Sequence, residues 1–305
     1  MDNRNEIRDF LTSRRAKITP EQAGLPAYGG RRRVLGLRRE EVALLAGVSV
    51  DYYTRLERGD LKGVSDSVLD AIASALHLDE PERAHLINLA QAANSTQRVR
   101  RGRRQAQDGV RPTIQRVLDA MTGAPAYVRN GRRDILAANR LGYALYSELY
   151  LDPARPVNVA RFVFLNPRAR SFFVDWSTAA NDMVAALRAE AGQNPYDREL
   201  SDLVGELSTR SEEFATRWAA QNVRFHRSGI KEIHHPIVGD LHLTFEAMDL
   251  PADPGLSLIV YSAEAGSGSD DALKLLASWT ADEEEPTAAA VDQLPPGQRD
   301  ETYDH

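Results

Sequence analysis

The sequence predicts an all-α domain of five helices followed by an α+β domain with a five-stranded antiparallel sheet. The chain has 305 residues, which is longer than one average domain, and 42% of these residues are apolar. Apolar residues recur at helical spacing up to about residue 93, whereas alternating β-prone runs begin only after Arg111. A basic stretch at 98–104 separates the two patterns.

The first domain is placed at residues 1–97. Apolar spacing predicts helices at about 7–15, 38–46, 50–58, 66–76 and 81–92. Within the fourth of these, Leu69, Ile72, Ala73 and Leu76 recur at three- and four-residue intervals, which forms one buried stripe. Residues 98–110 are then expected to be a basic linker.

The second domain is placed at residues 111–281. Two β-prone runs lie on either side of Asn130-Gly131, and both of these residues tolerate positive φ, which predicts a hairpin. Long helical stretches follow, and then β-prone runs at 223–227, 230–236, 241–248 and 256–263, which are counted as three more strands of the sheet. The helices are expected to cover one face of the sheet. Residues 282–305 are acidic without apolar periodicity, which predicts a disordered tail.

Composition excludes several classes of protein. The chain has no cysteine, which excludes disulfides, thiol nucleophiles and thiolate zinc sites. Its first residues are charged, and no run of about 18 apolar residues occurs, so we expect a cytoplasmic protein with no membrane partner. Residues 1–104 carry 19 basic and 14 acidic side chains, whereas the rest carry 19 and 30. This asymmetry favours a polyanionic partner for the first domain only.

The segment 39–59 has the spacing of two short helices that cross steeply. Ala43 is small enough for close crossing, and Gly47 accepts the positive φ of a tight turn. Ser49 can cap the second helix, and Gly59 is placed to end it. The other positions expected to face inward are Val42, Leu45, Val48, Tyr53 and Leu56.

The outward face of the second helix suits the major groove of DNA. Arg55 can donate two hydrogen bonds to guanine, Asp51 can accept from cytosine, and Tyr52 can contact a thymine methyl group or a phosphate. The alternative is a helical hairpin with a solvated polar face. We expect double-stranded DNA to contact Arg31, Arg32, Arg33, Arg38, Arg39, Ser49, Val50, Asp51, Tyr52, Arg55, Arg58 and Lys62.

Residues 6–92 resemble the phage-repressor (XRE-type) helix-turn-helix domain, through "GLRREEVALLAGVSVDYYTRLERG". From Arg31 to about Trp279 the chain resembles the MmyB-like regulators of actinobacteria and related bacteria. The segments that carry this resemblance are "RPTIQRVLDAMTGAPAYV", "NPRARSFFVDW", "HRSGIKEIHHPIVGDLHLTFEAMDLPADPGLSLIVYSAEAGS" and "ALKLLASW". The resemblance implies a DNA-binding domain joined to a PAS-like sensor domain, with fatty-acid-like ligands in some members.

The resemblance also assigns roles to single residues. It implies that Arg15 pairs with Glu57, which makes Glu57 structural. Arg39 replaces a glutamine that often touches the operator, which favours phosphate contact there. Gln221 stands where the MmyB-like pattern often has histidine. The long connection at 17–36, with its "GGRRR", is either a phosphate or minor-groove arm or a mobile loop.

Aromatic residues of the second domain are candidates for an apolar effector site. Their spacing by itself favours plain core, and the resemblance to a sensor domain favours a pocket for a small apolar effector such as a fatty acid. The candidates for the headgroup of an acid are Arg168, Arg170, Arg224 and His226. The candidate lining residues are Tyr127, Phe162, Phe164, Phe172, Phe173, Trp176, Met183, Trp218, Phe245 and Tyr261.

Four histidines raise the question of a metal site: His226, His234, His235 and His242. Neighbouring residues of a strand point to opposite faces, so His234 and His235 cannot share one site without a bulge. We therefore expect no metal and no resident cofactor.

Three functions fit these patterns. The first is a sequence-specific transcription regulator that binds a palindromic operator as a homodimer and responds to an apolar ligand. The second is a DNA-binding regulator whose other domain is a protein-interaction module without a small-molecule ligand. The third is an enzyme with a DNA-binding head, but the chain has no nucleophile elbow, glycine-rich phosphate loop or HExxH motif, so we expect no enzyme.

Overall fold

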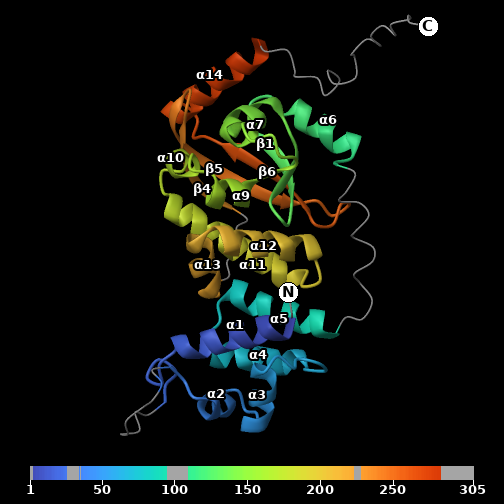
Figure 1. Ribbon diagram of the computed structural model, residues 1–305, viewed down its shortest axis with the longest axis vertical. Coiled ribbons are helices and arrows are strands. Elements are labelled where there is room, and N and C mark those ends of the chain that lie inside the picture. Colours follow the sequence, from blue (N-terminus) through green and yellow to red (C-terminus); the bar gives the residue numbers. More distant parts are fainter. Residues whose placement is uncertain (1–2, 26–33, 35, 95–108, 223–227, 283–305) are drawn as a thin grey trace, which may run out of the picture.

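The computed structural model describes residues 3–25, 34, 36–94, 109–222 and 228–282. Figure 1 shows two folded parts along the long axis of the molecule. The helices α1–α5 occupy one part, and the sheet with α6–α14 occupies the other. The predicted linker 98–110 lies outside the described residues except for its last two positions, as does nearly all of the predicted tail 282–305.

The first part consists of short helices around one apolar core. Ile7, Phe10 and Leu11 of the first helix, with Tyr53 and Leu56 of the third, are fully buried in it. Each helix predicted between residues 7 and 92 has a counterpart within a few residues. The helices are α1 (Asn3–Lys17), α2 (Arg39–Leu45), α3 (Val50–Glu57), α4 (Asp66–Ala75) and α5 (Glu80–Asn94).

The second part is α+β, as predicted. Its elements are α6 (Pro112–Ala120), β1 (Ala126–Asn130), β2 (Asp134–Ala138), α7 (Arg140–Leu145), α8 (Ser147–Tyr150), β3 (Val157–Asn158), α9 (Val159–Leu165), α10 (Ala169–Phe172), α11 (Trp176–Gln193), α12 (Arg198–Arg210), α13 (Glu212–Ala219), β4 (Ser228–His235), β5 (Gly239–Asp249), β6 (Leu256–Ser262) and α14 (Gly268–Asp282).

The sheet has six strands in the order β3-β2-β1-β6-β5-β4, so the prediction of five was wrong. All of its neighbouring strands are antiparallel. The additional strand, β3, is two residues long and pairs with Asp134 and Ile135, which is too short to show an alternating pattern in the sequence. The strand predicted at 223–227 lies outside the described residues.

The predicted β1–β2 hairpin is present, but its turn differs from the expected one. The positive φ, 72°, falls on Arg133 rather than on Asn130 or Gly131. Asn130 Nδ2 donates to Asp134 at 2.8 Å, and its Oδ1 accepts from the Asp134 backbone at 3.0 Å. A Cβ at position 131 would come within 2.1 Å of the carboxyl carbon of Glu190, which is the movable end of that side chain. Glycine at 131 therefore leaves room for the Glu190 side chain of α11 beside the hairpin.

Both faces of the sheet carry helices, so the expectation of one covered face was wrong. On one face, Phe172 and Ala180 pack against Tyr127, Phe245 and Tyr261. On the other face, Leu118 of α6 packs against residues of β1, β2 and β6, namely Val128, Ala137 and Leu256. Along β5 the predicted alternation is confirmed, with Leu241, Leu243 and Phe245 buried between exposed neighbours.

Helix α11 joins the two parts because its residues belong to three separate clusters. Ala180 packs in the core under the sheet, and Leu187 packs in a cluster with α12 and α13. Ala189 packs in the core of the first part, where α11 lies against α5. Figure 1 shows this contact at the middle of the molecule, with α2 and α3 at the far end.

Charged side chains are buried where α11 meets α1. Arg188 is 0% exposed and donates to Glu6 of α1, to the backbone oxygen of Trp218, and to Gln221 Oε1 at 2.6 Å. Arg14 of α1 donates to the backbone oxygen of Gln221. Because a buried charge without partners is costly, these contacts fix the relative position of the two parts.

A buried histidine completes this contact between the parts. Burial and the neighbouring cations Arg188 and Arg14 lower the pKa of His85 to about 3, so its imidazole is neutral at physiological pH. Gly192 of α11 makes room for it, since a Cβ there would lie 2.3 Å from His85 Nδ1.

No helix among the described residues is long and apolar enough to cross a membrane.

Gly59→Ala is expected to destabilise the protein more than Gly63→Ala. Both glycines have positive φ, 93° and 72°, so alanine strains either backbone by about 1 kcal/mol. At Gly59 the added Cβ would also lie 2.4 Å from the backbone oxygen of Arg4, whereas at Gly63 nothing lies within 4 Å. Urea denaturation measures both free energies of unfolding, and equal losses would contradict the close packing of α1 on this turn.

Candidate nucleic-acid interface

The α2–α3 pair has the local structure that its sequence predicts. Ala43 is buried, and Gly47 between the helices has φ 65°. Ser49 Oγ accepts from the backbone of Tyr52 at 3.1 Å and caps α3. Leu45 was expected to face inward, but it is 37% exposed. Helix α2 has only seven residues and buries one narrow stripe, which includes Val42.

Helix α3 separates a buried face from an open one. Tyr53 and Leu56 are fully buried in the core of the first part. On the opposite side, Val50 is 46% exposed, and Asp51 and Arg55 are exposed. The first turn of α3 therefore presents side chains to solvent, at the end of the molecule farthest from the sheet (Figure 1).

Glu57, at the end of α3, is a buried carboxylate that connects three helices. Its Oε1 accepts from Arg15 at 2.7 Å and from Thr12 at 3.0 Å, and its Oε2 accepts from Arg39 at 2.7 Å. Burial by itself would raise the pKa of Glu57, but these hydrogen bonds outweigh it and hold the pKa below its ordinary value. Glu57 is therefore ionised and fixes α3 relative to α1 and α2.

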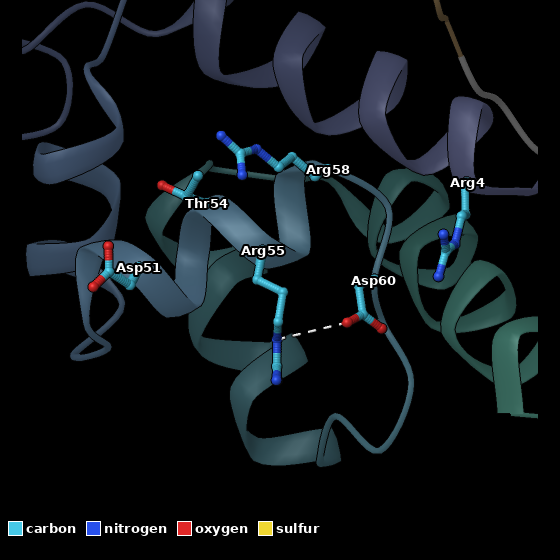
Figure 2. Close-up of a pocket in the computed structure, with 6 residues that line it drawn as sticks. All are labelled: Arg4, Asp51, Thr54, Arg55, Arg58 and Asp60. Atoms are coloured by element: carbon cyan, nitrogen blue, oxygen red, sulfur yellow. Dashed lines mark ion pairs between the residues drawn. The ribbon is translucent and has the colours of Figure 1, made fainter.

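A shallow hollow lies beside the exposed face of α3. In Figure 2, Arg55 reaches Asp60, with 3.8 Å between Nε and the carboxylate. The guanidinium of Arg55 also lies 4.9 Å from the centre of the Tyr52 ring. The hollow is lined by Arg4, Asp51, Thr54, Arg55, Arg58 and Asp60 (Figure 2). Three cations and two carboxylates thus surround it, an arrangement that suits an anionic partner with hydrogen-bonding groups.

The other predicted contact residues lie around this face. Arg38 and Arg39 are half exposed at the start of α2, where Arg38 is within 3.3 Å of Glu40 and Arg39 is bound to Glu57. Arg58 and Lys62 are exposed after α3. The predicted Arg31, Arg32 and Arg33 lie outside the described residues.

Most of the predicted effector residues form one aromatic cluster under the sheet. The buried members are Tyr127, Phe162, Phe172, Phe173, Phe245 and Tyr261, and the partly buried members are Phe164, Trp176 and Met183. Trp218 lies apart from them, stacked on Phe214 with ring centres 5.5 Å apart and beneath the guanidinium of Arg188 at 4.0 Å. Trp218 thus belongs to the contact between the two parts.

Three tyrosines place hydroxyl groups inside the aromatic cluster. The hydroxyls of Tyr146 and Tyr261 are 2.6 Å apart, and the rings of both lie within 6.2 Å of the Tyr127 ring. Burial raises the pKa of Tyr146 and Tyr261 well above the ordinary value, so both remain protonated. A hydrogen-bonding centre therefore lies in a mainly apolar core.

The predicted headgroup residues do not lie at this centre. Arg168 and Arg170 are on the surface, at 3.4 Å from Glu148 and 3.6 Å from Glu213 respectively. Arg224 and His226 lie outside the described residues.

The described histidines of β4 and β5 point in different directions. His234 is exposed and lies 2.6 Å from Asp240, while His242 is 3.3 Å from Glu232. His235 is buried, and its Nε2 donates to the backbone oxygen of Ala144 at 3.0 Å. Among the described residues no group of three His, Asp or Glu side chains is placed to hold a metal ion.

Comparison with protein families decides the identity of both parts. Residues 110–276, more than half of the chain, match the model of the MmyB-like transcription regulator ligand-binding domain. The chain belongs to this family of transcription regulators. Residues 12–86 of the regulator match a helix-turn-helix domain model, so the exposed helix α3 lies in a DNA-binding module. Neither model describes an enzyme. No curated protein matches the regulator.

The sequence analysis missed the buried arginine at the contact between the two parts. Arg188 interrupts an otherwise small and apolar stretch of α11, and this was the only signal of its burial.

Glu57→Gln is expected to lower the free energy of unfolding by about 1–3 kcal/mol at pH 7, because it weakens charge-assisted hydrogen bonds in a buried site. Folding lowers the pKa of Glu57. The stabilisation that its ionised form gives to the folded state is therefore complete at a pH above the ordinary pKa of 4.5, and it is lost as the pH falls through the folded-state pKa. Denaturant unfolding at pH 7 and pH 4 therefore gives a smaller difference at pH 4. Glu40→Gln, an exposed carboxylate beside Arg38, is the control and is expected to change little.

A difference between Glu57→Gln and the native chain that stays constant between pH 7 and pH 4 would contradict the assigned ionisation.

Proposed function

We propose that the regulator binds a palindromic operator sequence-specifically as a homodimer, with α3 in the major groove, and that a small apolar effector controls this binding. The observation that carries the proposal is the free first turn of α3, which projects at the end of the molecule while Tyr53 and Leu56 anchor its other face. In helix-turn-helix domains, the first turn of the second helix of the motif contacts base edges in the major groove, and α3 is exposed in the way that this contact requires.

The chemistry of the exposed residues supports both base and phosphate contacts. Arg55 has the planar fork that pairs with guanine, and Asp51 supplies an acceptor for cytosine. Val50 and Tyr52 suit contact with thymine methyl groups. Arg38, Arg39, Arg58 and Lys62 surround this face and are assigned to phosphates, as are Arg31, Arg32 and Arg33.

The small DNA-facing surface of α3 supports homodimerisation. One short helix covers few base pairs, and a two-fold pair of helices about one turn of DNA apart doubles the site. Analytical ultracentrifugation on a selected genomic fragment tests this: two chains per duplex support it, and one chain per duplex at saturation contradicts it.

The contact between the two parts supports effector control. An effector that displaces α11 moves Arg188 and Ala189, which pack directly on the first part. Coupling of this kind is measured as the ratio of operator affinities with and without effector. The aromatic cluster under the sheet, with its buried hydroxyls, is the proposed effector site.

A second candidate function is protein interaction without a small molecule. Its support is the exposed apolar surface of α14, where Leu275 is 51% and Trp279 is 53% exposed. Native mass spectrometry of the purified chain separates the candidates, because a bound small molecule favours effector control. An empty second part that captures a protein partner through α14 favours interaction.

Arg55→Ala is expected to weaken operator binding by about 1–3 kcal/mol and to relax base preference at one position per half-site. Arg38→Ala is expected to weaken all duplexes alike and to reduce the salt slope by about 1, as for loss of one phosphate contact. Arg198→Ala, an exposed arginine of α12, is the control with no expected effect. Fluorescence anisotropy with operator and random duplexes at several salt concentrations measures all three.

Equal losses on operator and random DNA for Arg55→Ala would contradict its base-reading role.

A further inference from the structure

Arg55 of α3 has two contacts that restrict where its guanidinium lies. Its Nε is 3.8 Å from the carboxylate of Asp60 (Figure 2), and the guanidinium lies 4.9 Å from the centre of the Tyr52 ring. A separation of 3.8 Å is an ion pair rather than a hydrogen bond, so Asp60 attracts the guanidinium without occupying an N–H donor. Because Nε makes this ion pair, the two terminal nitrogens of Arg55 are left to donate to O6 and N7 of a guanine.

The backbone around Asp60 fixes the place of its carboxylate. Gly59 turns the chain directly after α3 with φ 93°, and the backbone N–H of Asp60 then donates to the backbone oxygen of Arg55 at 3.3 Å. The second carboxylate oxygen of Asp60 accepts from the backbone N–H of Lys62 at 3.4 Å. The turn itself is packed against α1, since a Cβ at Gly59 would lie 2.4 Å from the backbone oxygen of Arg4. A short side chain on a rigid turn therefore faces the long side chain of Arg55.

The charge of Asp60 also acts on any DNA that reaches this surface. Three arginines line the hollow beside α3, and of its two carboxylates Asp60 is the one that pairs with Arg55. A carboxylate in this place repels the phosphates of every duplex and so lowers the affinity for DNA of any sequence. Specificity is the difference between two affinities, so a group that weakens random binding more than operator binding increases specificity.

We propose that Asp60 is a positioning residue for base recognition, which holds Arg55 in place for a guanine and weakens the attraction of Arg55 for phosphates. Asp60 lies outside α3 and acts through Arg55 rather than by a DNA contact of its own. The inference rests on the proposed base reading by α3. It adds that base specificity depends on a charge whose removal strengthens binding to random DNA.

The variant Asp60→Asn tests this directly, because it removes the charge but keeps the side-chain size and the oxygen that accepts from Lys62. Fluorescence anisotropy with the full-length chain compares three duplexes: the selected operator, the operator changed at the base pair whose preference Arg55→Ala abolishes, and a random duplex. The preference for the operator over the changed operator is expected to fall about three- to fivefold, as for loss of one exposed ion pair. The random duplex is expected to bind about two- to threefold more tightly, because one repulsive charge is gone.

Two further chains show whether the effect passes through Arg55. In the Arg55→Ala chain, Asp60→Asn is expected to leave base preference unchanged and still to strengthen binding to the random duplex. Glu40→Gln is the matched control, because it removes another exposed carboxylate of the first part, one that pairs with Arg38. It is expected to change binding of all three duplexes by the same factor.

The opposite directions of the two expected changes distinguish positioning from other roles. Equal strengthening of all three duplexes by Asp60→Asn would overturn the proposal, because it would show general repulsion alone. Equal weakening of all three would also overturn it, since this is the result of a damaged α3. Loss of preference at base pairs that Arg55 does not read would do the same.

The same measurements separate this inference from the proposed function. A native chain that prefers the operator, loses one base preference in Arg55→Ala and keeps it in Asp60→Asn contradicts the role of Asp60 and leaves base reading by α3 standing. A native chain that binds all three duplexes equally contradicts base reading itself, and the role of Asp60 fails with it.

Discussion

The ion pairs of Glu57 are the interaction on which the DNA-binding part depends. This carboxylate ties α1, α2 and α3 together, through hydrogen bonds from Arg15, Thr12 and Arg39. A helix of eight residues has little stability of its own, so its direction must come from such tertiary contacts. With Tyr53 and Leu56 buried beside Glu57, the first turn of α3 is held rigid and free of the rest of the chain.

The helix that positions Glu57 also carries the contact with the second part. On α1, Glu6 binds Arg188 and Arg14 binds the Gln221 backbone, while Arg15 binds Glu57. The contacts with the second part and with Glu57 thus lie on one helix, so a displacement of α1 would move the partners of Glu57 with it. This is a physical route for coupling, since α11 also forms part of the core under the sheet.

Local features were predictable from the sequence, and long-range ones were not. The α2–α3 turn depends on Gly47 and Ser49, whose roles are set by φ and by capping, so residue types at fixed spacing were sufficient. The strand β3 is too short to have a periodicity, and the burial of Arg188 depends on residues more than 30 positions away. Arg132 is similar, because its ion pairs with Asp197 and Glu199 form only when α12 packs against the hairpin.

The central claim, that the first turn of α3 enters DNA, is tested most directly by cleavage from a single attachment site. Because the chain has no cysteine, Val50→Cys can carry one tethered iron chelate, and Ser278→Cys on α14 provides the control at the opposite end of the molecule. On a genomic fragment selected by the protein, the account predicts cuts from position 50 at two places about one helical turn apart, and none from position 278. Cuts from position 278, or none from position 50 on bound DNA, would contradict it.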